Sequence, residues 1–220
     1  MNYLSHYYIY QDNKPNPLYT LGLVFPDLSR GFVSAAGKKD LPLHPHLDPL
    51  VEGCRKHYEA DKIFHACTFF EEGSHFCVEV LKKARFETEV PRRWFIGHIL
   101  FELLLDRILV RHQPQVCIDF YNDLNALNRE DLKEFIGLHA HKEQERFLKF
   151  FEHFCKAAYI RNYPDNNLFA FSLSRIILKA GLPALSLTDK IVLQECVWEL
   201  EETRFKESQG VLFELKEVFK

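Results

Sequence analysis

Residues 91–112 read PRRWFIGHILFELLLDRILVRH, and this stretch indicates the fold of the chain. Large apolar side chains recur at helical spacing between Trp94 and Leu109. Such a run predicts a long helix that is buried over most of its surface. Pro91 suits the first turn of that helix, and Pro114 prevents the helix from continuing.

Helix start and stop signals also precede this stretch. Asp48 followed by Pro49 predicts a helix start, with a capping side chain and a proline at the first helical position. We expect that helix to stop at Gly73. Ser74 then predicts the cap of a second, shorter helix that ends near Arg85.

The remaining sequence gives the same helical picture. Further helices are expected over residues 17–25, 114–127, 142–159 and 167–180. Another helix is expected to begin at Asn128, and the last is expected to begin near Thr188, with a weak point at Gly210. Residues 37–45 are expected to form a loop. No stretch alternates with a period of two between turn dipeptides, so no strand is predicted. We therefore predict an all-α fold, a single-domain helical bundle over residues 1–220, without repeats or linkers.

Composition limits the partners and the compartment. The formal net charge of −3 gives no general attraction to nucleic acid or to an anionic membrane. No apolar run approaches the roughly 18 residues that span a bilayer, and no secretory signal is expected. The 6 cysteines form no C-x-x-C pair, which argues against a zinc knuckle or a redox couple. We expect a protein of the reducing cytoplasm, and the sequence leaves its oligomeric state open.

Two pairs of residues near the N-terminus could carry metal chemistry. His57 and Asp61 are four residues apart, so both side chains leave one face of the expected helix. An imidazole and a carboxylate in this relation can share a divalent ion, although such a pair is also commonly a surface hydrogen bond. His6 follows an apolar, aromatic start, and Asp27 follows an expected helix end. Arg30, three residues after Asp27, offers a guanidinium group that can hold an anion.

Two further patterns each have a plainer interpretation beside the functional one. His98, Glu102 and Asp106 form a polar stripe on the apolar helix, which faces either a metal cleft or an internal network of hydrogen bonds. His44 and His46 have an attractive spacing but lie in an expected loop, so we interpret them as incidental.

The motifs resemble those of a known family in their order and spacing. MNYLSHYYI (1–9), GLVFPDLSRG (22–31) and EGCRKHYEAD (52–61) are similar to successive segments of the acyl carrier protein phosphodiesterases. The resemblance continues through residues 92–112, and a fainter match is LSR at residues 173–175.

The resemblance implies a fold similar to the HD-type metal phosphohydrolases and a set of site residues. The implied metal ligands are His6, Asp27, His57 and Asp61. The implied catalytic residues are Asp27, Arg30 and Asp106. The implied substrate contacts are Arg111 and His112, with Glu102 as nearby support. The implied cofactor is a divalent metal, most of all Mn²⁺, with Fe or Zn as alternatives; mixed imidazole and carboxylate ligands suit these ions.

The implied activity is hydrolysis of the bond between 4′-phosphopantetheine and a serine of holo-acyl carrier protein, which makes the carrier protein the substrate. Tyr58, Glu59 and Arg107 depart from the family pattern and bear on the substrate and on the activity itself. Two alternatives therefore stay open. One is an HD-like phosphohydrolase of a nucleotide or another small phosphodiester, and the other is an inactive helical module that binds carrier protein.

Overall fold

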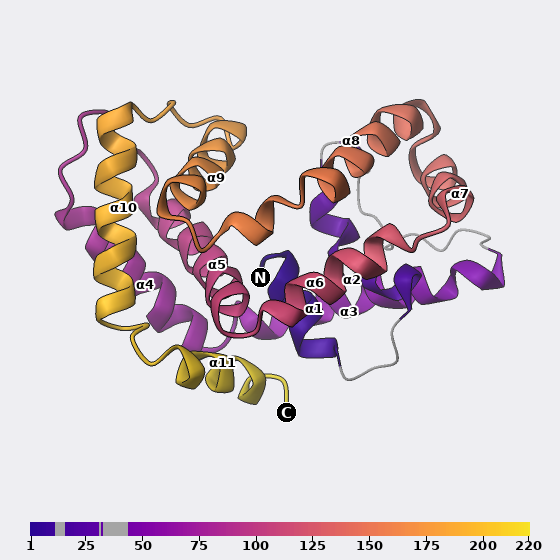
Figure 1. Cartoon of the computed structure of the whole chain (residues 1–220), viewed down its shortest axis with the longest axis horizontal. Helices are drawn as coiled ribbons and strands as arrows, with labels where there is room; N and C mark the ends of the chain where they lie inside the picture. Colours follow the sequence, from indigo (N-terminus) through magenta and orange to yellow (C-terminus); the bar gives the residue numbers. More distant parts are fainter. Residues whose placement is uncertain (12–15, 31, 33–43) are drawn as a thin grey trace. The chain divides into compact units, whose positions relative to one another are not determined.

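A computed structural model describes residues 1–11, 16–30, 32 and 44–220 of the chain. Over these residues the structure is helical and contains no strand, so the predicted all-α class is confirmed (Figure 1). The α-helices are α1 (Tyr3–Tyr10), α2 (Pro17–Leu28), α3 (Asp48–Phe64), α4 (Thr68–Lys83), α5 (Arg93–His112), α6 (Pro114–Asn125), α7 (Arg129–Ala140), α8 (Gln144–Ala157), α9 (Asn166–Lys179), α10 (Leu187–Glu202) and α11 (Ser208–Glu217).

The helices form two compact units, each built from two separate segments of the chain. Unit 1 comprises Met1–Lys62 and Pro114–Tyr159, and unit 2 comprises Ile63–Gln113 and Ile160–Lys220. Because each unit is discontinuous in sequence, no single cut in the chain separates them. The expected single domain over residues 1–220 stays a prediction.

In unit 1 the backbones of α2 and α3 touch at a pair of glycines. A Cβ atom on Gly22 would lie 2.2 Å from the carbonyl oxygen of Leu50, and one on Gly53 would lie 2.4 Å from that of Tyr19. Only glycine permits so close an approach. The crossing brings His57, one turn beyond Gly53, against the backbone of α2.

The remaining helices of unit 1 close its core through aromatic rings. Phe25 of α2 meets Phe135 of α7 and Phe147 of α8, with ring centroids 5.2 and 5.5 Å apart. Helices α1, α2 and α6 also pack against one another. The aromatic residues of α8 therefore serve the core, as their helical spacing predicts.

In unit 2, helix α4 packs along α5, and α9, α10 and α11 cover these two helices. The α4–α5 contact again depends on small residues. A Cβ atom on Gly73 would lie 2.4 Å from the ring of Phe101, and one on Gly97 would lie 2.5 Å from a methyl carbon of Val78.

This packing explains a wrong prediction. Helix α3 ends at Phe64, and α4 runs through Gly73 to Lys83 without a break there. Gly73 makes room for a neighbouring ring, and it does not end a helix. The break falls at residues 65–67 instead, which places His65 in a turn.

Other helix ends agree with the sequence to different degrees. The Asn16 side chain caps α2, which continues past Pro26 to Leu28, beyond the expected end at residue 25, so Asp27 lies in its last turn. Gly181 follows α9 with a φ of 77°, a backbone conformation that favours glycine after a helix end. The C-terminal break falls at residues 203–207 and not at Gly210, which lies inside α11. The expected loop over residues 37–45 lies mostly outside the described residues.

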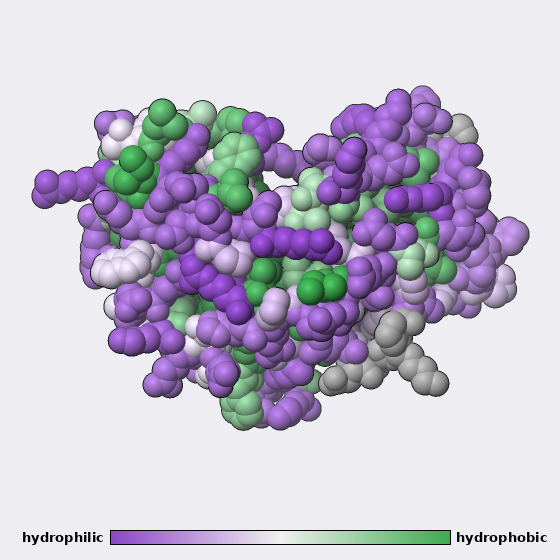
Figure 2. Space-filling model, viewed as in Figure 1, coloured by the Kyte–Doolittle hydropathy of each residue, from purple (hydrophilic) through white to green (hydrophobic). Residues whose placement is uncertain are grey.

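The surface agrees with the charge-rich composition. The face drawn in Figure 2 is mainly hydrophilic, with apolar side chains in small patches. In the part of the chain that the structure describes, no helix combines the length and hydrophobicity needed to cross a lipid bilayer.

Candidate metal centre

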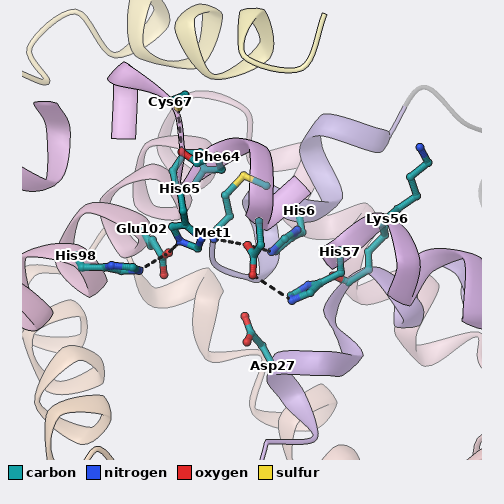
Figure 3. Close-up of polar contacts among 12 residues, drawn as sticks. Met1, His6, Asp27, Lys56, His57, Phe64, His65, Cys67, His98 and Glu102 are labelled. Carbon is teal, nitrogen blue, oxygen red and sulfur yellow. Dashed lines mark hydrogen bonds and ion pairs between the residues drawn. The ribbon is translucent and has the colours of Figure 1, made fainter. Parts of the chain in front are cut away.

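Three of the four predicted metal ligands converge within unit 1. His6 comes from α1 and His57 from α3 (Figure 3). Asp61 lies one turn after His57 on α3. The Nε2 atoms of His6 and His57 lie 3.2 and 3.4 Å from the two carboxylate oxygens of Asp61. The imidazole rings stack with centroids 4.1 Å apart. One ligand atom from each residue lies within 4.8 Å of the others, so the three side chains can share one ion.

The backbone of α2 fixes the orientation of His57. Its Nδ1 atom lies 2.8 Å from the carbonyl oxygen of Leu23. A carbonyl oxygen only accepts hydrogen bonds, so Nδ1 carries the hydrogen. In the neutral ring, the Nε2 lone pair then faces a carboxylate oxygen of Asp61. The Nε2 lone pair and the carboxylate oxygen are both acceptors, so a cation is required between them. This cation is either a second proton on the ring or a metal ion. Metal-binding histidines are commonly held in this way by a backbone carbonyl.

His6 is fully buried and suited to the same ion. Neither ring nitrogen of His6 has an aligned hydrogen-bond partner among the described residues, despite the short contact from Nε2 to Asp61. Burial, and next the neighbouring His57, lower the pKa of His6 to about 3. The ring is therefore neutral at neutral pH, and neutral imidazole is the form that binds metal.

Asp61 supplies the negative charge of the cluster. Burial acts to raise its pKa, but the contact of 3.2 Å with His6 Nε2 and the charge of the Met1 amino group outweigh this effect and hold the pKa well below its usual range. The amino group of Met1 also donates a hydrogen bond of 2.8 Å to Asp61 Oδ1. The carboxylate is therefore ionised at neutral pH.

Asp27, the fourth predicted ligand, is directed toward His57 from the last turn of α2 (Figure 3). It does not belong to the tight cluster of ligand atoms. Burial raises the pKa of Asp27, while the charges of His57 and Arg30 act in the opposite direction. Arg30 donates a hydrogen bond of 2.8 Å to Asp27 Oδ1. The structure thus brings Asp27 to the site, and its role as a ligand stays a prediction.

A second cluster lies in unit 2, where sequence reasoning foresaw only part of it. The Nε2 atoms of His65 and His98 each lie 3.0 Å from Glu102 Oε1. The i, i+4 spacing of His98 and Glu102 signalled the polar stripe on α5. His65 was missed because the sequence placed it inside a continuous helix, whereas it lies in the turn before α4.

The other predicted site residues also lie in unit 2. Asp106 is fully buried. Arg111 Nη1 pairs with Glu201 Oε1 at 2.6 Å, and His112 is exposed. Arg107 is fully buried and pairs with the same carboxylate at 2.7 Å, so its guanidinium group serves an internal ion pair. The catalytic role of Asp106 and the substrate roles of Arg111 and His112 stay predictions.

Arg111 and His112 do line a surface cavity of unit 2. Trp198 and Lys206 share this cavity. Its cationic groups are compatible with an anionic ligand, although Glu201 also lines the cavity and neutralises part of the charge.

A third group of possible ligands is exposed in unit 1. His46 Nε2 lies 3.4 Å from Glu134 Oε2 and 3.7 Å from Asp131 Oδ1, and His44 lies nearby. The two imidazoles are exposed, whereas the carboxylates are partly buried. We keep the interpretation that the pair of histidines is incidental.

Comparisons with models of protein families, with curated proteins and with solved structures find no match to this chain.

Proposed function

We propose that the chain is a metal-dependent phosphodiesterase whose metal is held by His6, His57 and Asp61. The observation that carries this proposal is the orientation of His57. Its Nδ1 atom is engaged by Leu23, and its Nε2 atom faces the carboxylate of Asp61. That arrangement calls for a cation, and the fully buried, neutral ring of His6 completes the set.

The ligand types define the class of ion. Two imidazoles with one or two carboxylates favour Mn²⁺, Fe²⁺ or Zn²⁺ over Ca²⁺ and Mg²⁺, which prefer oxygen ligands alone. When bound, such an ion supplies Lewis acidity, which lowers the pKa of water and draws charge from a phosphoryl oxygen.

The chain's own residues supply the remaining chemistry. The raised pKa of Asp27 favours a role as the base that accepts a proton from the attacking water, because a base works best when its pKa lies nearer the working pH. Arg30 is 78% exposed beside Asp27, where its guanidinium group can hold a phosphate oxygen of the substrate. The hydrogen bond to the Leu23 carbonyl oxygen holds the His57 ring in one orientation.

We infer the substrate from the motif resemblance. The four segments that resemble the acyl carrier protein phosphodiesterases favour holo-acyl carrier protein as the substrate, cleaved between 4′-phosphopantetheine and its serine.

The 6 cysteines are free thiols, and 5 of them are buried, which supports an assignment to the reducing cytoplasm.

The test is to incubate the purified chain with holo-acyl carrier protein, with Mn²⁺ or with a chelator, and to measure the intact mass of the carrier protein. We expect loss of the prosthetic arm only with Mn²⁺. His57→Ala removes this activity, whereas His75→Ala, at an exposed position of α4 outside all three clusters, retains it.

Two other results have defined meanings. Hydrolysis of a nucleotide or an aryl phosphodiester with intact holo-carrier protein would replace the substrate but keep the metal site. Binding of carrier protein without hydrolysis of any ester would indicate the inactive binding module.

A further inference from the structure

We propose that unit 2 holds a second divalent metal ion, bound by His65, His98 and Glu102. This site is built only from residues of unit 2 and does not depend on the proposed phosphodiesterase activity. The ion that we expect is a borderline Lewis acid, between hard and soft, such as Zn²⁺ or Fe²⁺.

The ligand atoms already have nearly the separations that an ion requires. Both Nε2 atoms lie 3.0 Å from the same oxygen, Glu102 Oε1, and the ring centroids of His65 and His98 are 5.0 Å apart. All three ligand atoms lie within 4.8 Å of one another. Ligands about 2.0–2.1 Å from a tetrahedral Zn²⁺ are themselves separated by about 3.3 Å. The two nitrogen–oxygen separations are therefore within a few tenths of an ångström of those in a coordination shell.

The two elements that carry the ligands are held in place independently of any metal. His98 and Glu102 are one turn apart on the same face of α5. His65 lies in the turn after Phe64, and the Cys67 thiol and backbone amide of this turn both donate to the Phe64 carbonyl oxygen. The Phe64 ring stacks on Phe101 of α5 with centroids 6.1 Å apart. Prearranged ligands of this kind lower the cost of binding.

The surroundings combine burial with access. The Glu102 side chain is 10% exposed, whereas His65 and His98 are 33% and 31% exposed. Phe70 packs its ring against both imidazoles, with centroids 4.8 Å from each. The carboxylate is thus largely buried, the two imidazoles are partly exposed, and the Phe70 ring covers one side. An ion can enter from the solvent side and keep an open coordination position there.

The chemistry of the ligands selects the ion. Two imidazoles and one carboxylate form the ligand set of His₂Glu zinc sites and of non-haem Fe(II) sites, both of which retain an open position. Ca²⁺ and Mg²⁺ favour oxygen ligands and do not suit this cluster.

The experiment counts ions per chain by calorimetric titration with Zn²⁺, and follows Co²⁺ as a spectroscopic stand-in through its visible absorption. Every chain tested carries His46→Ala, so that the exposed third cluster cannot contribute. In this background we expect two Zn²⁺ ions to bind per chain. A chain that also carries either His98→Ala or His57→Ala should bind one ion, and a chain that carries both should bind none. His75→Ala is the matched control and keeps two.

Glu102→Gln gives an independent reading, because it keeps the shape and one oxygen of the side chain but removes its charge. We expect at least about a tenfold loss of affinity for one equivalent. Circular dichroism checks that each variant remains folded.

The outcomes separate this proposal from the proposed function. If one equivalent binds and only His57→Ala removes it, the unit 2 cluster is a hydrogen-bond network and the second site is overturned. If only His98→Ala removes the bound ion, the second site stands and the first one fails. No binding in any chain overturns both.

Discussion

His57 Nδ1 lies 2.8 Å from the carbonyl oxygen of Leu23, across the contact between α3 and α2. This hydrogen bond exists because Gly22 and Gly53 let the two backbones touch one turn away. The orientation of a metal-binding imidazole is thus set by the packing of two helices.

The close crossing predicts a large effect of one added methyl group. We expect Gly22→Ala to lower the free energy of unfolding by about 2–3 kcal/mol, because its Cβ meets backbone atoms that cannot move aside. Gly210→Ala is the matched control. Its Cβ would meet nothing closer than 3.9 Å inside α11, so we expect stabilisation of up to about 1 kcal/mol. Urea denaturation measures both, and equal effects would contradict the packing described here.

Metal binding should stabilise the folded chain through His6. The parent chain for this test carries His46→Ala and His98→Ala, which weaken the other two clusters. With free Mn²⁺ at about 100 times its dissociation constant, we expect the parent chain to gain about 2.7 kcal/mol over the same chain in chelator. His6→Phe keeps a ring in the buried position, so the metal-free variant should lie within about 1.5 kcal/mol of the parent chain. It should show little gain from Mn²⁺. Thermal unfolding with and without Mn²⁺ checks this, and an undiminished gain in His6→Phe would exclude His6 as a ligand.

Arg107 should be a structural residue of unit 2. Its guanidinium group is fully buried, pairs with Glu201 and donates a hydrogen bond to the Tyr163 carbonyl oxygen. Arg107→Met removes the donor to the Tyr163 carbonyl oxygen and should cost about 1–3 kcal/mol, while Glu201 keeps its pair with Arg111. Glu195→Gln, at an exposed position of α10, should stay within about 0.5 kcal/mol of the wild type. A small effect of Arg107→Met in denaturant titration would contradict this role.

Asp189 should make unit 2 sensitive to acid. Its buried carboxylate accepts hydrogen bonds from the backbone amides of Ser186, Glu87 and Thr88. Burial acts to raise its pKa, but the hydrogen bonds outweigh burial and the pKa is lowered. The folded state therefore binds this proton less readily than the unfolded state. Its contribution to stability is present above the ordinary carboxyl range and is lost as the pH falls through the lowered folded pKa.

The measurement is the free energy of unfolding between pH 7 and pH 2.5 for the wild type and for Asp189→Asn. We expect the variant to be less stable by about 1–3 kcal/mol at pH 7, because a charged acceptor is lost. The difference should shrink at the acid end. A difference that is independent of pH would show that the charge of Asp189 is not the cause.

The sequence predicted most helices because their signals are local. Apolar spacing and start signals such as Asp48 depend on nearby residues, and α3 begins at Asp48 as predicted. The error at Gly73 has a tertiary cause, since a glycine that admits the ring of Phe101 looks in sequence like a helix end.

The candidate sites show the same difference between local signals, which the sequence reveals, and tertiary contacts, which it does not. The spacing of His57 and Asp61 indicated one half of the first cluster, and the family resemblance supplied His6. His65 could not be predicted, because its partners His98 and Glu102 are more than thirty residues away, and only the packing of α4 on α5 brings them together.

The most direct test of the first metal site is pulsed electron paramagnetic resonance of bound Mn²⁺. The chain should carry His46→Ala and His98→Ala, which weaken the other two clusters. We predict couplings from imidazole nitrogens in this background and their loss when His57→Ala is added. A Mn²⁺ signal coupled only to water protons, unchanged by His57→Ala, would contradict the claim that His6, His57 and Asp61 hold the ion.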